Sequence, residues 1–206
     1  DSLTAYIDDG AFKDVINKNS DAEYYNTLND ILGDLEGITD ELGENGLSAL
    51  LGDFYSAASN LEKFPTDMAI RQQFLLAAEN VCEKFNYVSD KLDSLEAEKY
   101  DDVQMQTTVI NSLFEDLAEA NKNHILNHQS DSTKVGIDNI LAELSDYMNV
   151  TTTTNKNGSV NVLINGVEVV QGTEVKQYLK SSFDSENPDE PLSYYLESND
   201  EAKRKT

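Results

Sequence analysis

The sequence is poor in cysteine, in basic residues and in long apolar runs. One cysteine, Cys82, among 206 residues excludes an intrachain disulfide and any zinc site built from cysteines. Only 15 Lys and Arg stand against 39 Asp and Glu, so the formal net charge is -24. Nucleic-acid phosphates and anionic lipids repel such a chain, and no run approaches the ~20 apolar residues of a membrane-spanning helix. We therefore expect neither nucleic-acid binding nor membrane binding.

The apolar residues that are present suffice for a core. They make up 39% of the chain and recur with clear spacing, unlike those of a disordered acidic tail. The acidic residues fall opposite the apolar stripes, which predicts that they form a solvated outer face. Cys82 lies in an apolar helical pattern, so we expect it to be buried and inert. The chain starts at Asp1 without a signal-peptide pattern, and we interpret it as a fragment of something longer.

Glycine and proline are unevenly distributed along the chain. Neither occurs between residues 66 and 135, whereas glycines cluster before this stretch and separate short segments after it. The distribution predicts a helical part followed by a β-rich part, with the change near Asn149. We accordingly expect a helical bundle domain over 1–148, and over 149–206 a β meander with the beginning of an outer β-rich segment.

Two helices are predicted before residue 66. Apolar residues at steps of three and four give the first helix, from about Asp21 to Leu42. The second runs from about Leu47 to Glu62 and should bury Phe54 and Leu61. A break at Pro65 follows, where Thr66 or Asp67 can cap the next helix by accepting backbone N–H bonds.

The strongest pattern lies between residues 67 and 128. A heptad seam runs through Phe74, Ala78, Val81, Phe85, Val88, Leu92 and Leu95, and resumes as Val103, Ile110, Leu113, Leu117 and Ala120. Because nothing breaks the stretch, it predicts one long helix from about Asp67 to His128, in an elongated bundle. A helical hairpin broken near Glu98–Asp101 is the competing interpretation. Phe74, Phe85, Leu92 and Leu113 are expected in the core.

Short elements are predicted after residue 136. A helix is expected from about Asp138 to Met148, followed by a three-stranded antiparallel meander over 150–154, 160–164 and 167–170. Asn165-Gly166 is a strong hairpin signal. Residues 174–182 fit a helix and residues 192–197 a strand. The fold class is therefore mainly α with a small β-rich C-terminal part.

No residue pattern indicates catalysis. There is no glycine-rich phosphate loop, and no nucleophile lies near a base. His124 and His128 have the i, i+4 spacing that can hold zinc, but a solvated helix end explains them better. The acidic loop 184–190 has oxygen ligands for Ca²⁺ but lacks the EF-hand glycine. We expect no enzyme activity, no cofactor and no metal.

The order of several short motifs resembles a known family. The motifs are Asn45-Gly46-Leu47-Ser48, Leu51-Gly52-Asp53-Phe54-Tyr55, Pro65 with Arg71, Ile110-Asn111-Ser112-Leu113, Asp138-Asn139-Ile140-Leu141 and Gly158-Ser159-Val160-Asn161-Val162. They resemble, in the same order, the hook-associated protein 1 family, which joins hook and filament in the bacterial flagellum. The resemblance covers roughly residues 21–172.

The resemblance implies a structural, extracellular subunit exported without a cleaved signal peptide. It implies as partners neighbouring copies in a ring or filament, the hook protein and the next hook-associated protein. The fragment, which lacks the terminal coiled-coil helices of the family, is expected to be monomeric. Asn45, Arg71 and Asn111 fall at matched polar positions, so we expect them to fix loop or inter-helix geometry, Arg71 through an ion pair. A helical adhesin or secreted effector that binds a host partner is the alternative.

Overall fold

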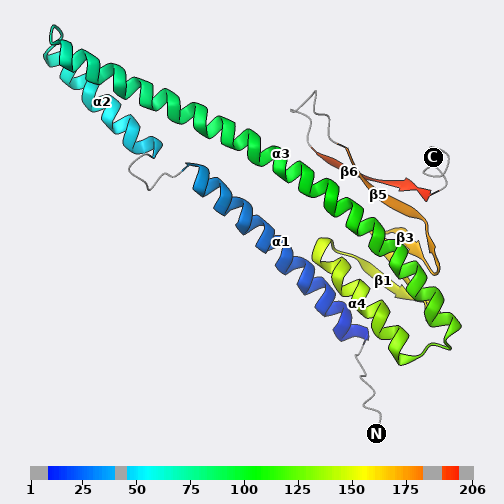
Figure 1. Cartoon of the computed structure of the whole chain (residues 1–206). Coiled ribbons are helices and arrows are strands. Elements are labelled where there is room, and N and C mark those ends of the chain that lie inside the picture. Colours follow the sequence, from blue (N-terminus) through cyan, green and yellow to red (C-terminus); the bar gives the residue numbers. More distant parts are fainter. Residues whose placement is uncertain (1–8, 40–45, 183–191, 200–206) are drawn as a thin grey trace. The chain divides into compact units, whose positions relative to one another are not determined.

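The computed structural model describes residues 9–39, 46–182 and 192–199. Within them the chain is mainly helical and ends in small antiparallel sheets, which confirms the predicted fold class (Figure 1). The helices are α1 (Asp9–Thr39), α2 (Leu47–Lys63), α3 (Met68–Leu126) and α4 (Asp131–Tyr147). The strands are β1 (Thr151–Thr154), β2 (Val160–Ile164), β3 (Val167–Gln171), β4 (Glu174–Val175), β5 (Gln177–Ser182) and β6 (Ser193–Ser198).

The chain divides into two compact units. Unit 1 comprises residues 1–26 and 100–206, and unit 2 comprises residues 27–99. The predicted domain boundary at 148/149 falls inside unit 1, where helices and strands share one hydrophobic core. That two separate domains meet at residues 148 and 149 remains a prediction.

Helix α3 is unbroken from Met68 to Leu126, which confirms the long helix and excludes the hairpin near residue 98 (Figure 1). Its first turn is capped by Asp67, whose Oδ1 accepts the Ala69 N–H at 2.8 Å. At its other end, His128 (φ 51°) and Gln129 (φ 58°) take left-handed conformations. There the Gln129 N–H donates to the His124 carbonyl at 2.8 Å, a bond typical of helix C-termini.

Unit 2 contains the α2–α3 helical hairpin and the end of α1. The rings of Phe54 and Phe74 lie 5.3 Å apart, and Leu61 is half-buried on the same face of α2. Lys99 Nζ lies 3.5 Å from Asp34 Oδ2. Burial opposes the charged form of Lys99, but the neighbouring Glu98 and Asp34 carboxylates outweigh it and raise the lysine pKa.

Part of the heptad seam in unit 2 is exposed. Phe85 is 54% exposed and Leu92 is 38% exposed, and Cys82 is exposed on the same helix. The prediction that Phe85 and Leu92 lie in the core of this chain is therefore wrong, as is the buried Cys82. A heptad pattern marks an apolar stripe, but a single neighbouring helix covers only part of its width.

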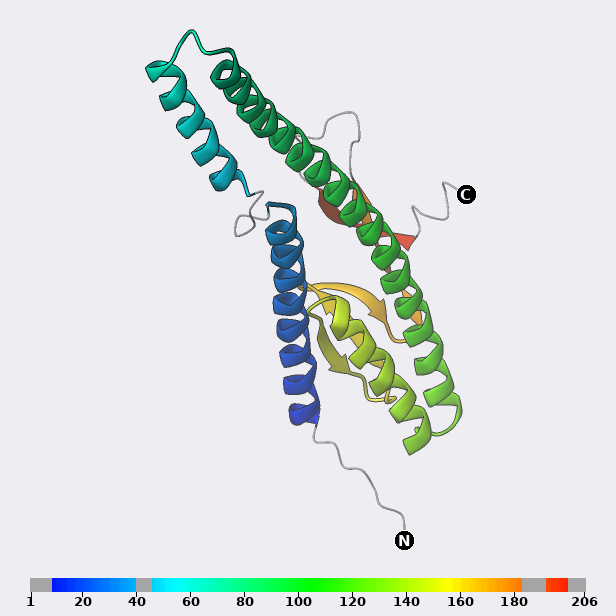
Figure 2. The same cartoon turned by 60° about the vertical axis from the view of Figure 1, so that its left-hand side comes forward.

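Unit 1 holds the main core. In both cartoon views α4 lies between the N-terminal part of α1 and the C-terminal part of α3 (Figures 1 and 2). Leu113 is 5% exposed and belongs to this core, as the seam predicts. The other members include Ile16 of α1, Phe114 and Leu117 of α3, Ile137, Leu141 and Leu144 of α4, and Val162, Val169, Val170 and Leu179 of the strands.

Packing in unit 1 extends two helices beyond their predicted starts. Helix α1 begins at Asp9 rather than near Asp21, because Ile16 is buried and Asn19 donates to Ser145 Oγ of α4 at 2.9 Å. Helix α4 begins at Asp131 rather than at Asp138 and passes through Gly136. Glycine inside a helix costs about 1 kcal/mol, which burial of the apolar residues that follow it, Ile137, Leu141 and Leu144, offsets.

The strands form two antiparallel sheets. The first has the order β1-β2-β3-β4, which contains the predicted meander, with Asn165-Gly166 in the β2–β3 turn. The second pairs β5 with β6, which confirms the strand predicted over 192–197. The helix predicted over 174–182 is wrong. The Lys176 N–H donates to the Val169 carbonyl at 2.8 Å, and a side chain of α3 bonds the Leu179 backbone, so tertiary hydrogen bonds favour the extended form.

Two leucines of α3 test this assignment of the core. We expect Leu113→Ala to lower the free energy of unfolding by about 2–5 kcal/mol, because it opens a cavity in a closed core. The matched change Leu92→Ala, at a 38% exposed site, should cost about 1 kcal/mol or less. Urea unfolding of both variants, followed by circular dichroism, checks the difference, and equal losses would contradict it.

Candidate functional site

Asn111 attaches the second sheet to α3. Its Nδ2 donates to the Leu179 carbonyl at 2.8 Å, and its Oδ1 accepts the Leu179 N–H at 2.8 Å. The carboxamide thus pairs with the backbone of β5 as a neighbouring strand would. These bonds join a helix and a strand rather than two helices, and the role of Asn111 in fixing geometry remains a proposal.

Asn121, ten residues further along α3, makes the same kind of bond with β2. Its Oδ1 accepts the Val160 N–H and its Nδ2 donates to the Val160 carbonyl, both at 2.8 Å. Nδ2 also donates to the Gly172 carbonyl at 2.7 Å. The side chain is fully buried. We call Asn111 and Asn121 the asparagine clamps.

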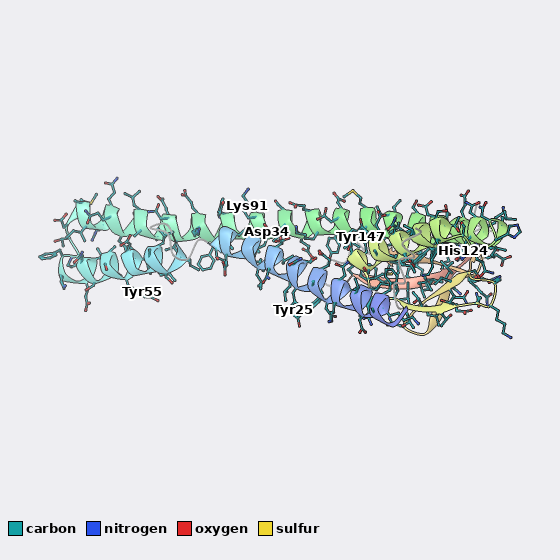
Figure 3. All side chains as sticks on the ribbon, turned by 90° about the horizontal axis from the view of Figure 1, so that it is seen from below. Tyr25, Asp34, Tyr55, Lys91, His124 and Tyr147 are labelled. Carbon is teal, nitrogen blue, oxygen red and sulfur yellow. The ribbon has the colours of Figure 1, made fainter. Side chains whose placement is uncertain are left out.

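His124 is buried one turn after the second clamp, near the end of α3 (Figure 3). His124 Nδ1 forms a hydrogen bond with Thr133 Oγ1 at 2.7 Å, and the Thr133 hydroxyl also lies 2.8 Å from the Ser130 carbonyl oxygen. The ring also lies against Gly158 of the β1–β2 turn: a Cβ added there would be 2.8 Å from Nε2. The prediction of a solvated helix end at His124 is therefore wrong.

The two histidines do not form a metal clamp. Helix α3 ends at Leu126, so His128 does not follow His124 on one helical face. Among the described residues, no group of three or more His, Cys, Asp or Glu is placed to hold a metal ion. The acidic loop 184–190 lies outside the described residues. No helix in the described part of the chain is long and apolar enough to cross a membrane.

Arg71 acts on backbone rather than on a carboxylate. It is exposed, and its Nε–H donates to the Pro65 carbonyl at 2.7 Å across the α2–α3 turn. Within the described ranges it forms no ion pair, so the predicted carboxylate partner is replaced by a loop carbonyl. Its role in fixing loop geometry remains a proposal. Asn45 lies outside the described residues.

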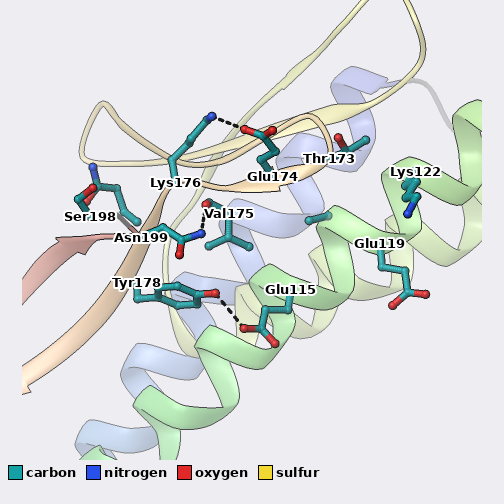
Figure 4. Close-up of a pocket in the computed structure, with 12 residues that line it drawn as sticks. Glu115, Glu119, Lys122, Thr173, Glu174, Val175, Lys176, Tyr178, Ser198 and Asn199 are labelled. Carbon is teal, nitrogen blue, oxygen red and sulfur yellow. Dashed lines mark hydrogen bonds and ion pairs between the residues drawn. The ribbon is translucent and has the colours of Figure 1, made fainter. Parts of the chain in front are cut away.

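A polar cleft of about 950 Å³ lies between α3 and the β4–β5 segment (Figure 4). At its floor the Tyr178 hydroxyl donates to Glu115 Oε1 at 2.9 Å. Burial, and then the Glu115 carboxylate, raise the pKa of the Tyr178 phenol above its ordinary value. Both signs of charge line the cleft, with Glu119 and Lys122 on α3. With acidic and basic side chains mixed in the lining, the residues indicate no single ligand.

A second groove, of about 590 Å³, differs from the cleft in that none of its described lining residues is charged. It lies between α3, the end of α4, the β2–β3 turn and β6. Among its lining residues that the structure describes there is no Asp, Glu, Lys or Arg, although 26% of the chain is charged. Tyr147, Tyr194 and Tyr195 line it, 39%, 53% and 51% exposed. An uncharged, tyrosine-rich hollow suits polypeptide contact.

Sequence reasoning singled out Asn111 by resemblance but missed Asn121. A polar residue inside an apolar helical stripe is a weak signal, because many such residues face solvent. The signal for Asn121 is its position eight residues after the core residue Leu113, near the buried Leu117 and Ala118. What it bonds depends on strands that are distant in sequence.

Removing the second clamp should destabilise unit 1. Asn121→Ala leaves the Val160 N–H, the Val160 carbonyl and the carbonyl of Gly172 in the β3–β4 turn without their partner, and each buried unsatisfied group costs about 1–3 kcal/mol. We expect the free energy of unfolding to fall by at least about 2 kcal/mol in urea titrations. Asn123→Ala, an exposed asparagine on the same helix, is the matched control and should be near neutral. Equal stability of the two variants would contradict a clamp.

Substitutions at two turn glycines distinguish the cost of backbone strain from the cost of a packing clash. Gly158 (φ 81°) and Gly166 (φ 83°) have the same left-handed conformation, so an alanine at either costs about 1–2 kcal/mol. Only at Gly158 would the new Cβ meet the His124 ring; at Gly166 nothing lies within 4 Å. We therefore expect Gly158→Ala to lower the melting temperature more than Gly166→Ala. The reverse order in thermal unfolding would disprove the His124 contact.

Known proteins resemble this chain in sequence and in fold. A model of the "Flagellar hook-associated protein FlgK helical domain" matches residues 32–206. Flagellar hook-associated protein 1 of Bacillus subtilis (strain 168) is 27% identical over 105 residues, which are 51% of this chain and 21% of that protein. The flagellar hook junction protein FlgK of Burkholderia pseudomallei superposes with a TM-score of 0.74 at 15% identity, over 91% of this chain and 33% of that chain.

The chain thus spans about a fifth of the curated relative and a third of the solved one. At 15% identity the solved structure shows a common fold. The family model, in contrast, covers most of the sequence, from the end of α1 through β6. The chain belongs to the family of the FlgK flagellar hook-associated protein helical domain.

Proposed function

We propose that the chain is part of a structural subunit of the bacterial flagellum, a hook-associated protein that joins hook to filament by lateral packing. The observation that carries this proposal is the family match over residues 32–206. The Bacillus subtilis relative is a flagellar hook-associated protein and the Burkholderia pseudomallei structure is a flagellar hook junction protein, which supports the same role. On this proposal the protein is extracellular and exported without a cleaved signal peptide, and it carries no catalytic site.

The exposed apolar side chains of unit 2 support a packing role. Leu75, Leu76 and Phe85 of α3 are each more than half exposed. Leu28 and Leu32 of α1, in the same unit, are 40% and 48% exposed. Exposed apolar surface of this kind marks contacts with other polypeptide. It suits a subunit whose helices are completed by neighbouring copies, by the hook protein or by the next hook-associated protein.

The helical adhesin or secreted effector has less support. The groove and cleft of unit 1 identify no host ligand, and no comparison points to such a protein. We further propose that residues 149–206 begin an outer β-rich segment, attached to the helical part through the asparagine clamps. Asn45 and Arg71 are proposed to fix the loops on either side of α2.

A genetic experiment tests the junction role. We expect deletion of the full gene to leave cells with hooks but without filaments, because the filament would lack its attachment point. Electron microscopy of the deletion strain reads this out, and the intact gene supplied in trans should restore filaments. Normal filaments on the deletion strain, in a genome without a second copy, would refute the proposal.

Packing through unit 2 has its own test in the same strain. The full gene carrying Phe85→Ser should restore filaments poorly, although the purified chain should keep its unfolding free energy because Phe85 is already exposed. Tyr55→Ser on α2, 68% exposed, is the matched control. Full complementation by Phe85→Ser would argue against packing at this face while leaving the junction role intact.

A further inference from the structure

We propose that Asn165–Gly166, at the tip of the β2–β3 turn, is a site of spontaneous deamidation that introduces a negative charge into the uncharged groove. Asn165 is one of the residues that line this groove. The inference is independent of the proposed function, because it concerns the chemistry of one turn and compares two Asn–Gly pairs within the same chain.

The reaction needs only the chain and water. The Gly166 backbone nitrogen loses its proton and attacks Cγ of the Asn165 side chain. A new C–N bond closes a five-membered succinimide, while the Cγ–Nδ2 bond breaks and ammonia leaves with the added proton. Water then opens either ring C–N bond, which yields aspartate or isoaspartate. Glycine favours the attack because it has no side chain to obstruct it and its backbone is permissive.

The β2–β3 turn leaves this pair free to react. Asn165 and Gly166 are both exposed. Among the described residues, no hydrogen bond holds the Asn165 side chain or the Gly166 N–H. No atom lies within 4 Å of the Cβ position of Gly166. The left-handed turn (φ 49° and 83°) must open before the nitrogen reaches Cγ, and an unpacked, solvent-exposed turn opens at low cost.

Asn157–Gly158, in the β1–β2 turn of the same sheet, provides a comparison. Hydrogen bonds hold this pair in place. The Gly158 N–H, which would have to lose its proton, donates to the Asn155 carbonyl at 2.9 Å. Asn157 Oδ1 accepts the Ser159 N–H at 3.2 Å and the Ser159 hydroxyl at 2.7 Å, which fixes the carboxamide. The His124 ring against Gly158 prevents this turn from rearranging. We expect this pair to persist.

Conversion of Asn165 changes the groove more than it changes the chain. One further charge alters a net charge of -24 only slightly. Among the lining residues that the structure describes, it is the first carboxylate beside Tyr194, Tyr195 and the apolar residues of α3. A carboxylate there makes it costlier to cover the groove with an apolar segment and repels an acidic one. Isoaspartate also adds a backbone methylene at the turn.

Peptide mass spectrometry of the intact chain, aged at mildly alkaline pH, tests the proposal. Asn165 should convert roughly tenfold faster than Asn157, the ratio that arises if the held turn costs about 1.4 kcal/mol more to open. The rate at Asn165 should also fall at mildly acidic pH, because the attacking nitrogen must lose a proton. An isoaspartyl methyltransferase assay should label the Asn165 peptide. Equal rates, a faster reaction at Asn157 or an unmodified Asn165 would overturn the proposal.

Two variants control for the cause of the difference. Gly166→Ala should slow conversion at Asn165 and leave Asn157 unchanged, and circular dichroism verifies that the sheet persists. His124→Ala should accelerate conversion at Asn157 alone, because it frees the Gly158 turn. Acceleration at both sites would mean that global unfolding sets the rates, which would also count against local protection at Gly158.

Discussion

The pairing of two asparagine carboxamides on α3 with strand backbone is the interaction on which the β part depends. Each clamp satisfies both the N–H and the carbonyl of one residue, Leu179 in β5 and Val160 in β2. A strand that packs against a helix ordinarily leaves such groups unpaired at its edge, and burying them unpaired is costly. The clamps remove this cost, so both sheets can lie directly on α3.

The consequences extend through unit 1. With β2 held at Val160, the β1–β2 turn lies against His124, which forms a hydrogen bond with Thr133 at the start of α4. With β5 held at Leu179, the residues of β6 form one wall of the uncharged groove. The same region therefore contains rigid, hydrogen-bonded turns and one free turn at Asn165–Gly166. The difference between held and free turns decides which Asn–Gly pair can form a succinimide.

Unit 2 has the opposite character. Its described part keeps apolar residues exposed along α1 and α3, and Lys99 pairs there with Asp34. Exposed apolar side chains contribute little to the stability of the isolated chain, but they lower the free energy of association with another polypeptide. A division into a unit stabilised within itself and a unit that offers surface suits a subunit of an assembly.

The sequence by itself determined the helical class and the β2–β3 hairpin, and it favoured an unbroken α3 with a cap at Thr66 or Asp67. These features depend on neighbouring residues: apolar spacing, the absence of Gly and Pro between 66 and 135, and the Asn165-Gly166 turn. The tertiary structure alone decided the starts of α1 and α4, the extended form of 177–182, the burial of His124 and the exposure of Phe85 and Leu92. The physical reason is that these features depend on contacts between residues far apart in the chain. Examples are the hydrogen bonds of Asn111 to Leu179 and the part of an apolar stripe that a neighbouring helix covers. Local patterns specify which side chains are apolar, but only packing decides which of them lose water.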